Sequence, residues 1–559
     1  MSAPNAGMAN RAISRSSGLR AHRQAPRRLA ASHPASVPTP MRPMATNWTR
    51  RRFLIGSGAT AGAVVLGGAA CSSSDGAGDD TADDAGDDAQ GDEMSADGVV
   101  SLSDVPTGGT IFGWISQVFD QGIRRPGYPA DEWAEGWIAD RFRSIGLDNV
   151  RLEPITVTRW EPTDWSLEVI GPDGEATDVD CFPVPFAAPV DGLEVDLAAY
   201  DQASAANVRG RAALFDVPLI RIPADLLATA GSAPEDPSGR IVDPDGSLTG
   251  AQHIVPFGAQ FQDVMEPSVE AGAAAFIGTL TDYPGDSFNY FVPYDAIARP
   301  IPGVWVNGTD GARLRAQLAR GPVRVRLTVA STREDVESHN VVGELEGADD
   351  ETVMIGSHHD GPWASAVEDG SGISLVLAQA TYWAAQPVER RPHRLVFLLQ
   401  GGHMSGGAGL HGYIEAHRAE LEQVVLEVHL EHAALEFAER DGAVVPTGQP
   451  VPRWFFTSRI PALEAAVADA LATEGLGRSM ILAPDAFGEQ PPTDGAFYHR
   501  EGVPVMNFLT APFYLFDAMD TLDKIDRDNL VPLTRATIRI IESTRGVSAA
   551  EMRAGVVPT

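Results

Sequence analysis

Residues 353–363 read VMIGSHHDGPW, and the chain continues with EDGSG at 368–372. The first segment is an apolar run with the length of a buried β-strand, and it ends abruptly in two histidines and an aspartate. The second segment places an acidic pair in a Gly-rich turn, after which residues 373–383 have the composition of a helix. A strand, a polar turn and a helix in this order are typical of α/β proteins, which bind ligands at the carboxyl ends of their strands.

Two residues at this strand end are of types that hold divalent metal ions. His358 offers an imidazole nitrogen, and Asp369 offers a carboxylate whose two oxygens can bridge two ions. Asp360, two residues after His358, can orient the imidazole ring. A polar strand end with chance histidines gives the same local pattern, so the wider order of residues has to decide between the two interpretations.

The composition excludes several classes of protein. The chain has 559 residues, 43% of them hydrophobic, and a formal net charge of −34. This length allows two or three domains, and so acidic a chain lacks the basic surface that nucleic acid requires. Cys71 and Cys181 are the only cysteines, which excludes a disulfide scaffold and a cysteine-rich metal site.

The first hundred residues have the character of targeting and linker sequence. Residues 49–55 read TRRRFLI and precede a small apolar run that ends at Cys71, which resembles a twin-arginine export signal with a lipoprotein-type cleavage site. We expect residues 1–71 to be a disordered n-region and signal, and 72–108 an acidic, disordered tether. The protein is then periplasmic or in the cell envelope, and meets the membrane only through a lipid on Cys71.

The lead-in SHNVVGELEG at 338–347, then His358-x-Asp360, then Asp369 before Gly-Ser-Gly, resembles the co-catalytic zinc exopeptidases, which include bacterial aminopeptidases and glutamate carboxypeptidase. The resemblance covers residues from about 109 to 546. It implies a mixed, mostly parallel α/β sheet with helices on both faces. It also implies that a metal-activated water hydrolyses peptide or amide bonds.

The pattern of elements divides this region further. Residues 109–179 open the catalytic domain with two amphipathic helices and a strand, and residues 336–546 form its main part. Between them, residues 180–335 show short strands and many turns, which resembles the protease-associated domain that several of these exopeptidases carry as an insertion. We expect a small β-rich module that shapes access to the substrate. Residues 547–559 form a C-terminal tail.

The resemblance is incomplete at the catalytic positions. Gly402 and His403 stand where the family has two glutamates, the first a general base and the second a metal ligand. Glu431 corresponds to the terminal carboxylate ligand. Phe516 stands where the last metal histidine is expected, four residues before the run DTLD at 520–523.

These departures predict an altered site. The metal ligands implied by the resemblance are His358, Asp369, His403 and Glu431. They hold one zinc ion firmly, and a second ion is left open. A water-activating base must come from elsewhere, and the candidates are His359, His411, His429 and Glu427. Glu427, His429 and Glu431 alternate along one strand and therefore share a face.

Two functions follow from this inventory. The first is an exported metallopeptidase that acts on a peptide or amide substrate through an atypical site. The alternative is a catalytically impaired pseudopeptidase that keeps the fold to bind a peptide or an envelope partner. The many histidines and glutamates at strand ends favour the enzyme, because buried ionisable groups are costly to keep. The sequence indicates no nucleic-acid partner and no particular oligomeric state.

Export is testable at the twin-arginine box. Replacing Arg50 and Arg51 by Lys should leave the protein in the cytoplasm, because the export machinery reads the arginine pair. Cell fractionation with immunodetection measures this, and Arg42→Lys, which lies outside the box, serves as the control. Unchanged export of the double variant would contradict the assignment.

Overall fold

The computed structural model describes residues 103–556 with four internal gaps, at 172–173, 225–240, 259–261 and 487–491. The expected signal, Cys71 and the tether up to residue 102 lie outside the described residues. Within the described part, no helix combines the length and the hydrophobicity that a membrane span requires.

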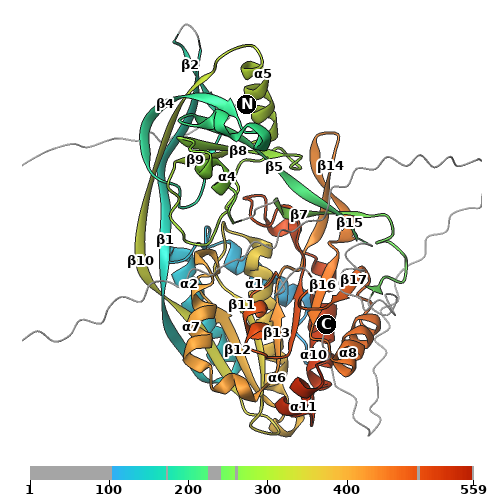
Figure 1. The fold of residues 1–559 in the computed structure, drawn as a ribbon. Helices are drawn as coiled ribbons and strands as arrows, with labels where there is room; N and C mark the ends of the chain where they lie inside the picture. Colours follow the sequence, from blue (N-terminus) through green and yellow to red (C-terminus); the bar gives the residue numbers. More distant parts are fainter. Residues whose placement is uncertain (1–102, 172–173, 225–240, 259–261, 487–491, 557–559) are drawn as a thin grey trace, which may run out of the picture. The chain divides into compact units, whose positions relative to one another are not determined.

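Strand β11 (Thr352–His358) is the central strand of the catalytic half of the sheet (Figure 1). It runs parallel to β12 (Arg394–Gln400) on one side and to β13 (Val424–Leu430) on the other. β18 (Val505–Leu509) adds a further parallel strand beyond β13. β10 (Arg324–Leu345) pairs antiparallel with β12, so the sheet is mixed with a parallel centre.

Side chains of these strands alternate between two hydrophobic cores, as the pleat requires. Val353 and Ile355 belong to the larger core, whereas Met354 between them belongs to a core on the opposite face. The helices that contribute to the larger core include α1 (Gly108–Phe119), α2 (Pro129–Ile145), α6 (Gly372–Ala385), α8 (Pro461–Thr473) and α10 (Leu530–Glu542). Those that contribute to the other core include α7 (Ala408–His417) and α9 (Gly495–Arg500). Helices on both faces of a mixed sheet confirm the expected fold class.

The two longest strands extend the sheet beyond the catalytic half. β1 (Asp148–Ile170) pairs antiparallel with β10 along nearly its whole length. β4 (Val190–Ala199) joins the first half of β10, and the sheet continues through β5 (Ala212–Pro223), β8 (Ala275–Thr281) and β9 (Gly303–Val306). These strands lie within residues 180–335, where the sequence predicts a β-rich segment.

The borders of that segment stay predictions. Asp335 lies inside β10, opposite Thr158 of β1, so the expected second border falls within a continuous strand. The sequence pattern indicates where the short strands give way to the catalytic half. It does not show that a single strand, β10, belongs to both regions.

The remaining elements are short or lie near the edges. They are β2 (Ala176–Val179), β3 (Phe182–Pro183), β6 (Ile241–Val242), β7 (Gln252–Gly258), β14 (Leu435–Arg440), β15 (Ala443–Pro450), β16 (Arg453–Thr457), β17 (Ser479–Leu482), α4 (Glu266–Glu270), α5 (Gly308–Leu318) and α11 (Ala549–Ala554). Single helical turns include those at 366–371, before α6, and at 403–405, before α7.

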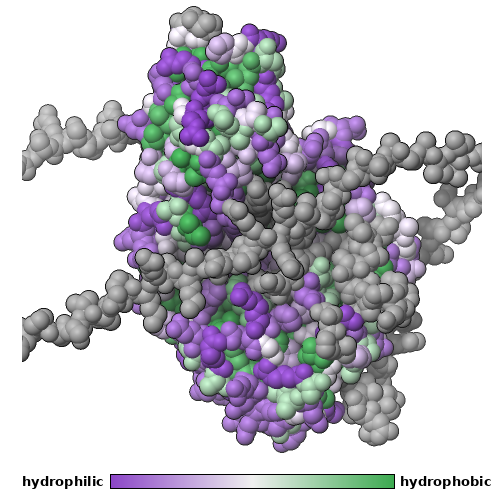
Figure 2. Space-filling model, viewed as in Figure 1, coloured by the Kyte–Doolittle hydropathy of each residue, from purple (hydrophilic) through white to green (hydrophobic). Residues whose placement is uncertain are grey.

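The coloured surface in Figure 2 mixes hydrophilic and hydrophobic residues without one dominant apolar area. Exposed large hydrophobic side chains among the described residues are Ile123, Leu152, Trp165, Ile297, Val388 and Val556. Exposed hydrophobic side chains of this kind are ordinary on the surface of a globular protein.

Gly372 fixes the approach of α6 to the ends of β11 and β13. A Cβ atom at this position would overlap the Asp369 carboxylate, the Ser357 hydroxyl and the Leu430 carbonyl oxygen. Gly372→Ala should therefore lower the free energy of unfolding by about 2 kcal/mol or more, as overpacking of a buried site does. Urea unfolding followed by circular dichroism measures the change.

The matched control is Gly113→Ala in α1, where a Cβ would meet no atom within 4 Å. This variant should be neutral or gain up to about 1 kcal/mol, because alanine is the better helix former. Equal stability of the two variants would show that the close packing at Gly372 is unimportant.

Candidate metal centre

Eight ionisable side chains meet where the parallel strands of the sheet end. They are His358 at the end of β11, Glu368 in the following turn, His403 after β12, Glu427 and His429 in β13, Glu431 and His432 after β13, and Asp494 before α9. All eight are buried except His403, whose side chain is 14% exposed. Because parallel strands finish at the same edge, residues far apart in the chain come together here.

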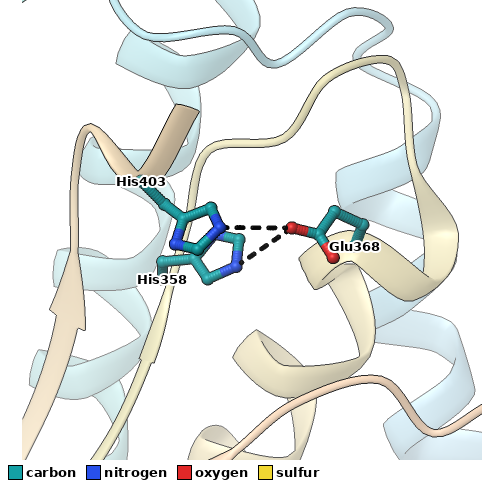
Figure 3. A group of neighbouring side chains, drawn as sticks. All are labelled: His358, Glu368 and His403. Atoms are coloured by element: carbon teal, nitrogen blue, oxygen red, sulfur yellow. Dashed lines mark ion pairs between the residues drawn. The ribbon is translucent and has the colours of Figure 1, made fainter. Parts of the chain in front are cut away.

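His358, Glu368 and His403 form a compact group (Figure 3). Glu368 Oε1 lies 3.5 Å from His358 Nε2 and 3.7 Å from His403 Nε2. These separations exceed hydrogen-bond lengths. They are close to the ~3.3 Å between ligand atoms on a tetrahedral zinc ion with bonds of about 2.0–2.1 Å. The spacing therefore fits a metal ion better than direct pairing.

Each of four histidines in the cluster has its Nδ1 atom beside an acceptor, which leaves Nε2 as the outward nitrogen. The acceptors are the Asp360 carbonyl (2.9 Å from His358), Asp494 Oδ1 (2.9 Å from His403), Glu427 Oε1 (3.0 Å from His429) and the Thr510 carbonyl (2.8 Å from His432). When Nδ1 carries the proton and donates it to such an acceptor, Nε2 has a lone pair, which is the arrangement of metal-ligating histidines.

Several polar atoms of the cluster have no hydrogen-bond partner among the described residues. They are His358 Nε2, Glu368 Oε2, His429 Nε2, Glu431 Oε1, His432 Nε2 and Asp494 Oδ2. Two pairs among them are at ion-pair distance without the angles of a hydrogen bond: His432 Nε2 and Glu368 Oε2 at 2.6 Å, and His429 Nε2 and Glu431 Oε1 at 3.0 Å. Buried polar atoms are normally paired, so these residues fit a bound divalent cation.

Protons and a metal ion compete for the same nitrogens. Burial alone would lower the pKa of His403, but the carboxylates of Asp494 and Glu368 outweigh it and raise that pKa to about 10. The pKa of His432 rises to about 10 in the same way, against burial and through Glu368. Metal binding at these positions releases protons, so the affinity is expected to increase with pH.

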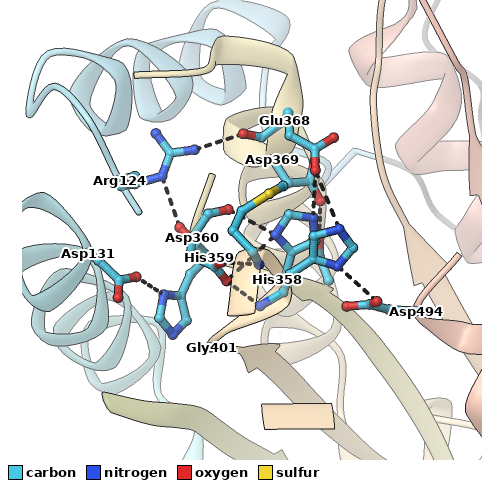
Figure 4. A network of polar contacts seen from close by, with 12 residues as sticks. Arg124, Asp131, His358, His359, Asp360, Glu368, Asp369, Gly401 and Asp494 are labelled. Carbon is cyan, nitrogen blue, oxygen red and sulfur yellow. Dashed lines mark hydrogen bonds and ion pairs between the residues drawn. The ribbon is translucent and has the colours of Figure 1, made fainter. Parts of the chain in front are cut away.

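The structure groups Glu368, rather than the expected Asp369, with His358 and His403. Asp369 accepts hydrogen bonds from the Ser357 hydroxyl and, at 2.8 Å, from the Gly372 amide. Burial raises the pKa of Asp369. The two acids are neighbours in a tight turn and point in different directions (Figure 4), which the sequence pattern does not distinguish.

Glu431 and Asp360 also take positions that differ in detail from the expectation. Glu431 joins His429 and Asp494 in a second compact group, and its Oε2 lies 4.0 Å from His432 Nε2. Asp360 orients His358 through its backbone carbonyl rather than its carboxylate. The Asp360 carboxylate accepts from the amides of His403, at 2.9 Å, and Met404, at 2.7 Å, and so fixes the turn that carries His403.

The four candidate bases are engaged or lie outside the cluster. His359 Nδ1 lies 2.8 Å from Asp131 Oδ1, and its Nε2 lies 2.8 Å from the His339 carbonyl. Burial would lower the pKa of His359, but Asp131 outweighs it and raises that pKa to about 9, so the ring is cationic and a poor base. His411 stands exposed at the start of α7.

Glu427 and His429 act on each other. Glu427 Oε1 accepts from His429, and Glu427 Oε2 accepts from the Asn507 side chain at 2.8 Å. The expectation that they share a strand face is confirmed by this contact. Glu427 thus orients His429 rather than facing the first group.

Gly402 and Phe516 are fitted to their surroundings. Gly402 has a φ of +74°, and a Cβ there would lie 2.7 Å from Val157 Cγ1. A glutamate at this position would be strained, so the position is structurally committed to glycine. Phe516, at the place of the expected ligand, packs at a tilt against Tyr294 with ring centroids 5.2 Å apart, and Tyr294 stacks on His403 at 5.2 Å.

Arg124 was not singled out by the sequence, although it anchors the turn that carries Glu368 (Figure 4). Its buried guanidinium donates to the backbone carbonyl oxygens of His359, Ala364, Ser365 and Glu368. Asp520 accepts from the amides of Val367 and Glu368, at 2.8 and 2.9 Å. Arg124 carries no sequence signal, whereas Asp520 belongs to the recognised run DTLD.

Three other residues of the cluster were not proposed from the sequence as metal ligands or bases. Glu368 is half of the acidic pair, His432 follows Glu431 directly, and Asp494 lies in the recognised loop TDGAF at 493–497. The sequence thus contained these residues in recognised motifs. It did not show which of two neighbouring residues, Glu368 or Asp369, points into the site.

Comparison with known proteins agrees with this geometry. Residues 340–541 match Peptidase family M28. Carboxypeptidase Q of Mus musculus is 22% identical over 322 residues, which cover 54% of this chain and 58% of that protein. Leucine aminopeptidase 2 of Arthroderma otae is 24% identical over 241 residues, 43% of this chain and 39% of that protein. The chain thus matches less than two thirds of either relative.

Solved structures extend the similarity beyond the family match. A Peptidase M28 precursor from Shewanella amazonensis has a TM-score of 0.59 at 21% identity, covering 78% of this chain and 92% of that one. A zinc aminopeptidase from Bacillus subtilis has a TM-score of 0.56 at 16% identity, covering 79% and 96%. The match at residues 340–541 confirms the resemblance to the family, the solved structures confirm the fold, and the inserted protease-associated domain stays a prediction.

Arg124→Lys tests the anchoring of the turn. A lysine cannot donate to four carbonyl groups, so Glu368 should lose its fixed position and zinc affinity should fall roughly 10- to 100-fold. Zinc titration against a competing chelator measures this. Arg143→Lys on the exposed side of α2 is the control and should leave the affinity unchanged. Equal affinities would show that Arg124 does not position the ligand.

Proposed function

We propose that the chain is a metal-dependent exopeptidase that hydrolyses peptide or amide bonds, with a zinc ion held by His358, Glu368 and His403. One observation carries the proposal. The ligand atoms of these three side chains lie within 4.8 Å of one another. At 3.5 and 3.7 Å, the histidine nitrogens are too far from Glu368 Oε1 for hydrogen bonds, and His358 Nε2 has no hydrogen-bond partner among the described residues. The family match at 340–541 and the peptidase relatives support the same reaction class.

A zinc ion with three protein ligands supplies Lewis acidity and activates water at neutral pH. The protein residues set its surroundings. Asp360 and Arg124 fix the turns that carry the ligands, and Tyr294 covers one face of His403. A dry, preorganised site of this kind strengthens electrostatic interactions with a substrate carbonyl.

The expected rate is modest. The position of the general-base glutamate is Gly402, and the candidate bases named from the sequence are engaged elsewhere or lie outside the cluster. Loss of a positioned base typically lowers a rate roughly 10²- to 10⁴-fold. The same two observations favour the second candidate, a pseudopeptidase that binds a peptide or an envelope partner without hydrolysing it.

Tyr294 supports a substrate-shaping role for the β-rich segment. It belongs to that segment and stacks between His403 and Phe516, with ring centroids 5.2 Å from each. The proposed location is the cell envelope, reached by twin-arginine export with a lipid on Cys71, and it is supported by the sequence of residues 49–71.

The test combines metal content with hydrolysis of aminoacyl-nitroanilides and a dipeptide panel. Hydrolysis should stop with 1,10-phenanthroline and return with zinc. His358→Asn should lose both zinc and activity, because the asparagine amide can still donate to the Asp360 carbonyl but no longer offers Nε2. His417→Ala, outside the cluster, should behave like the unmodified protein.

Hydrolysis that survives the chelator would contradict metal dependence. A folded protein that binds no zinc and hydrolyses no member of the panel would favour the pseudopeptidase.

A further inference from the structure

Arg125 follows Arg124 directly and lies in a box of aromatic rings. The residue is 3% exposed. Its guanidinium carbon, Cζ, faces five rings at distances typical of cation–π interactions. The rings, with the distances of their centroids from Cζ, are Phe291 (4.5 Å), Trp363 (4.7 Å), Phe182 (5.6 Å), Tyr128 (5.7 Å) and Trp160 (5.8 Å).

The charge of Arg125 is compensated by these rings rather than by a carboxylate. None of the ion pairs among the described residues involves Arg125. Its Nε atom donates to the Pro362 carbonyl at 2.8 Å, and its buried Nη2 atom has no hydrogen-bond partner in the part of the chain that the structure describes. An arginine stays charged inside a protein, and a buried charge is costly unless its surroundings stabilise it. The aromatic faces supply that stabilisation here.

The rings belong to two regions of the chain. Trp363 lies in the turn after β11, which leads from His358 to Glu368, whereas Phe182 and Phe291 belong to the β-rich segment. The carbonyl oxygen of Phe516 connects the same two regions. It accepts from Trp363 Nε1 at 3.1 Å and from the Phe291 amide at 2.9 Å. One guanidinium and one carbonyl group thus join the turn to the β-rich segment.

The joined part of the β-rich segment leads directly to the metal centre. Tyr294 is three residues after Phe291, and its ring stacks on His403 at 5.2 Å. The Tyr294 carbonyl accepts from the amide of Gly406 at 3.0 Å, in the turn that carries His403. The position of the segment at Phe291 therefore sets the position of Tyr294 beside the metal ligand.

We propose that Arg125 is a positioning residue. Its cation–π contacts dock the β-rich segment against the turn after β11 and thereby hold Tyr294 over His403. The two consecutive arginines have separate tasks: Arg124 fixes the backbone at Glu368, and Arg125 fixes the segment that lies beside the centre. The effect on hydrolysis rests on the proposed function, whereas the docking itself does not.

The charge, rather than the bulk of the side chain, is the decisive property. Replacing a buried charge by an apolar side chain of similar size is often neutral for stability, so a residue that only fills space tolerates methionine. A residue that holds aromatic rings through its charge does not. Arg125→Met and Arg125→Lys separate the two cases, because methionine keeps most of the length and lysine keeps the charge.

The experiment is hydrogen–deuterium exchange with mass spectrometry on the full-length chain. The reporters are peptides that contain the Phe291 and Gly406 amides, since both amides donate to carbonyl groups across the joined regions. Peptides from β11 and β12 report on the core of the sheet. The matched control is Arg141→Met on α2, where a guanidinium lies 5.1 Å from the ring of Trp137, outside the box.

Arg125→Met should speed exchange at Phe291 and Gly406 roughly tenfold or more, the factor expected from losing a desolvated cation–π contact, with β11 and β12 unchanged. Arg125→Lys should give a smaller increase, because lysine keeps the charge but loses the planar stacking of the guanidinium. Arg141→Met should exchange like the unmodified chain at both reporters.

Two further measurements distinguish docking from a general loss of structure. Zinc affinity should stay unchanged in Arg125→Met, because Arg124 still holds the backbone at Glu368. For peptides that the unmodified chain hydrolyses, KM should rise by more than kcat falls, since Tyr294 borders the bound substrate. Circular dichroism checks folding. If Arg125→Met does not fold, Phe291→Leu decides, because it removes the nearest ring of the segment and should speed exchange at Gly406.

Unchanged exchange at both reporters in Arg125→Met, or at Gly406 in Phe291→Leu, would overturn the docking role. Equal exchange in Arg125→Met and Arg125→Lys would overturn the role of the charge. A loss of zinc affinity in Arg125→Met as large as that in Arg124→Lys would place Arg125 on the ligand turn alone and would also contradict the proposal. If the unmodified chain hydrolyses no peptide, the proposed function fails while the exchange data still decide the role of Arg125.

Discussion

The buried negative charge of Glu368 is the constraint on which the rest of the site depends. Burial raises the pKa of such a carboxyl group, but His432 and His358 outweigh that effect and hold the pKa of Glu368 below its usual range. Arg124 and Asp520 fix the backbone on both sides of the same residue. The parallel ends of β11, β12 and β13 bring these partners together. The fold thus places the histidines His358 and His432 around the carboxylate of Glu368.

Much of this fold was predictable because its signals are local. The period of apolar residues predicted the two helices α1 and α2, and α2 ends at Gly146, a left-handed residue with φ of +99°. The strand expected after these helices is β1, which runs to Ile170 because β10 offers it a partner along that length. A single sequence does not show how far a partner strand extends. For the same reason, the expected border at Asp335 falls inside the continuous strand β10.

The site was predictable by type but not by residue. His358 was recognised from its position at a strand end, His403 and Glu431 were implied by the family resemblance, and all three lie in the cluster. The choice between Glu368 and Asp369 depends on the turn that Arg124 and Asp520 hold, and these two residues are distant in sequence. His359 seemed available as a base, but its partner Asp131 comes from α2. Long-range pairs of this kind leave no local pattern.

The presence of His403 where the resembled family has a glutamate would change what the centre can do with a metal ion. A carboxylate ligand neutralises part of the charge of the ion, whereas a neutral imidazole does not, so a site of two histidines and Glu368 leaves a net positive charge. With a zinc ion held by His358, Glu368 and His403, that charge would stabilise a developing oxyanion and lower the pKa of a bound water. It therefore offsets part of what the chain loses at Gly402. Tyr294, which packs between His403 and Phe516, would act in the same direction, because an apolar ring beside the site lowers the local dielectric constant.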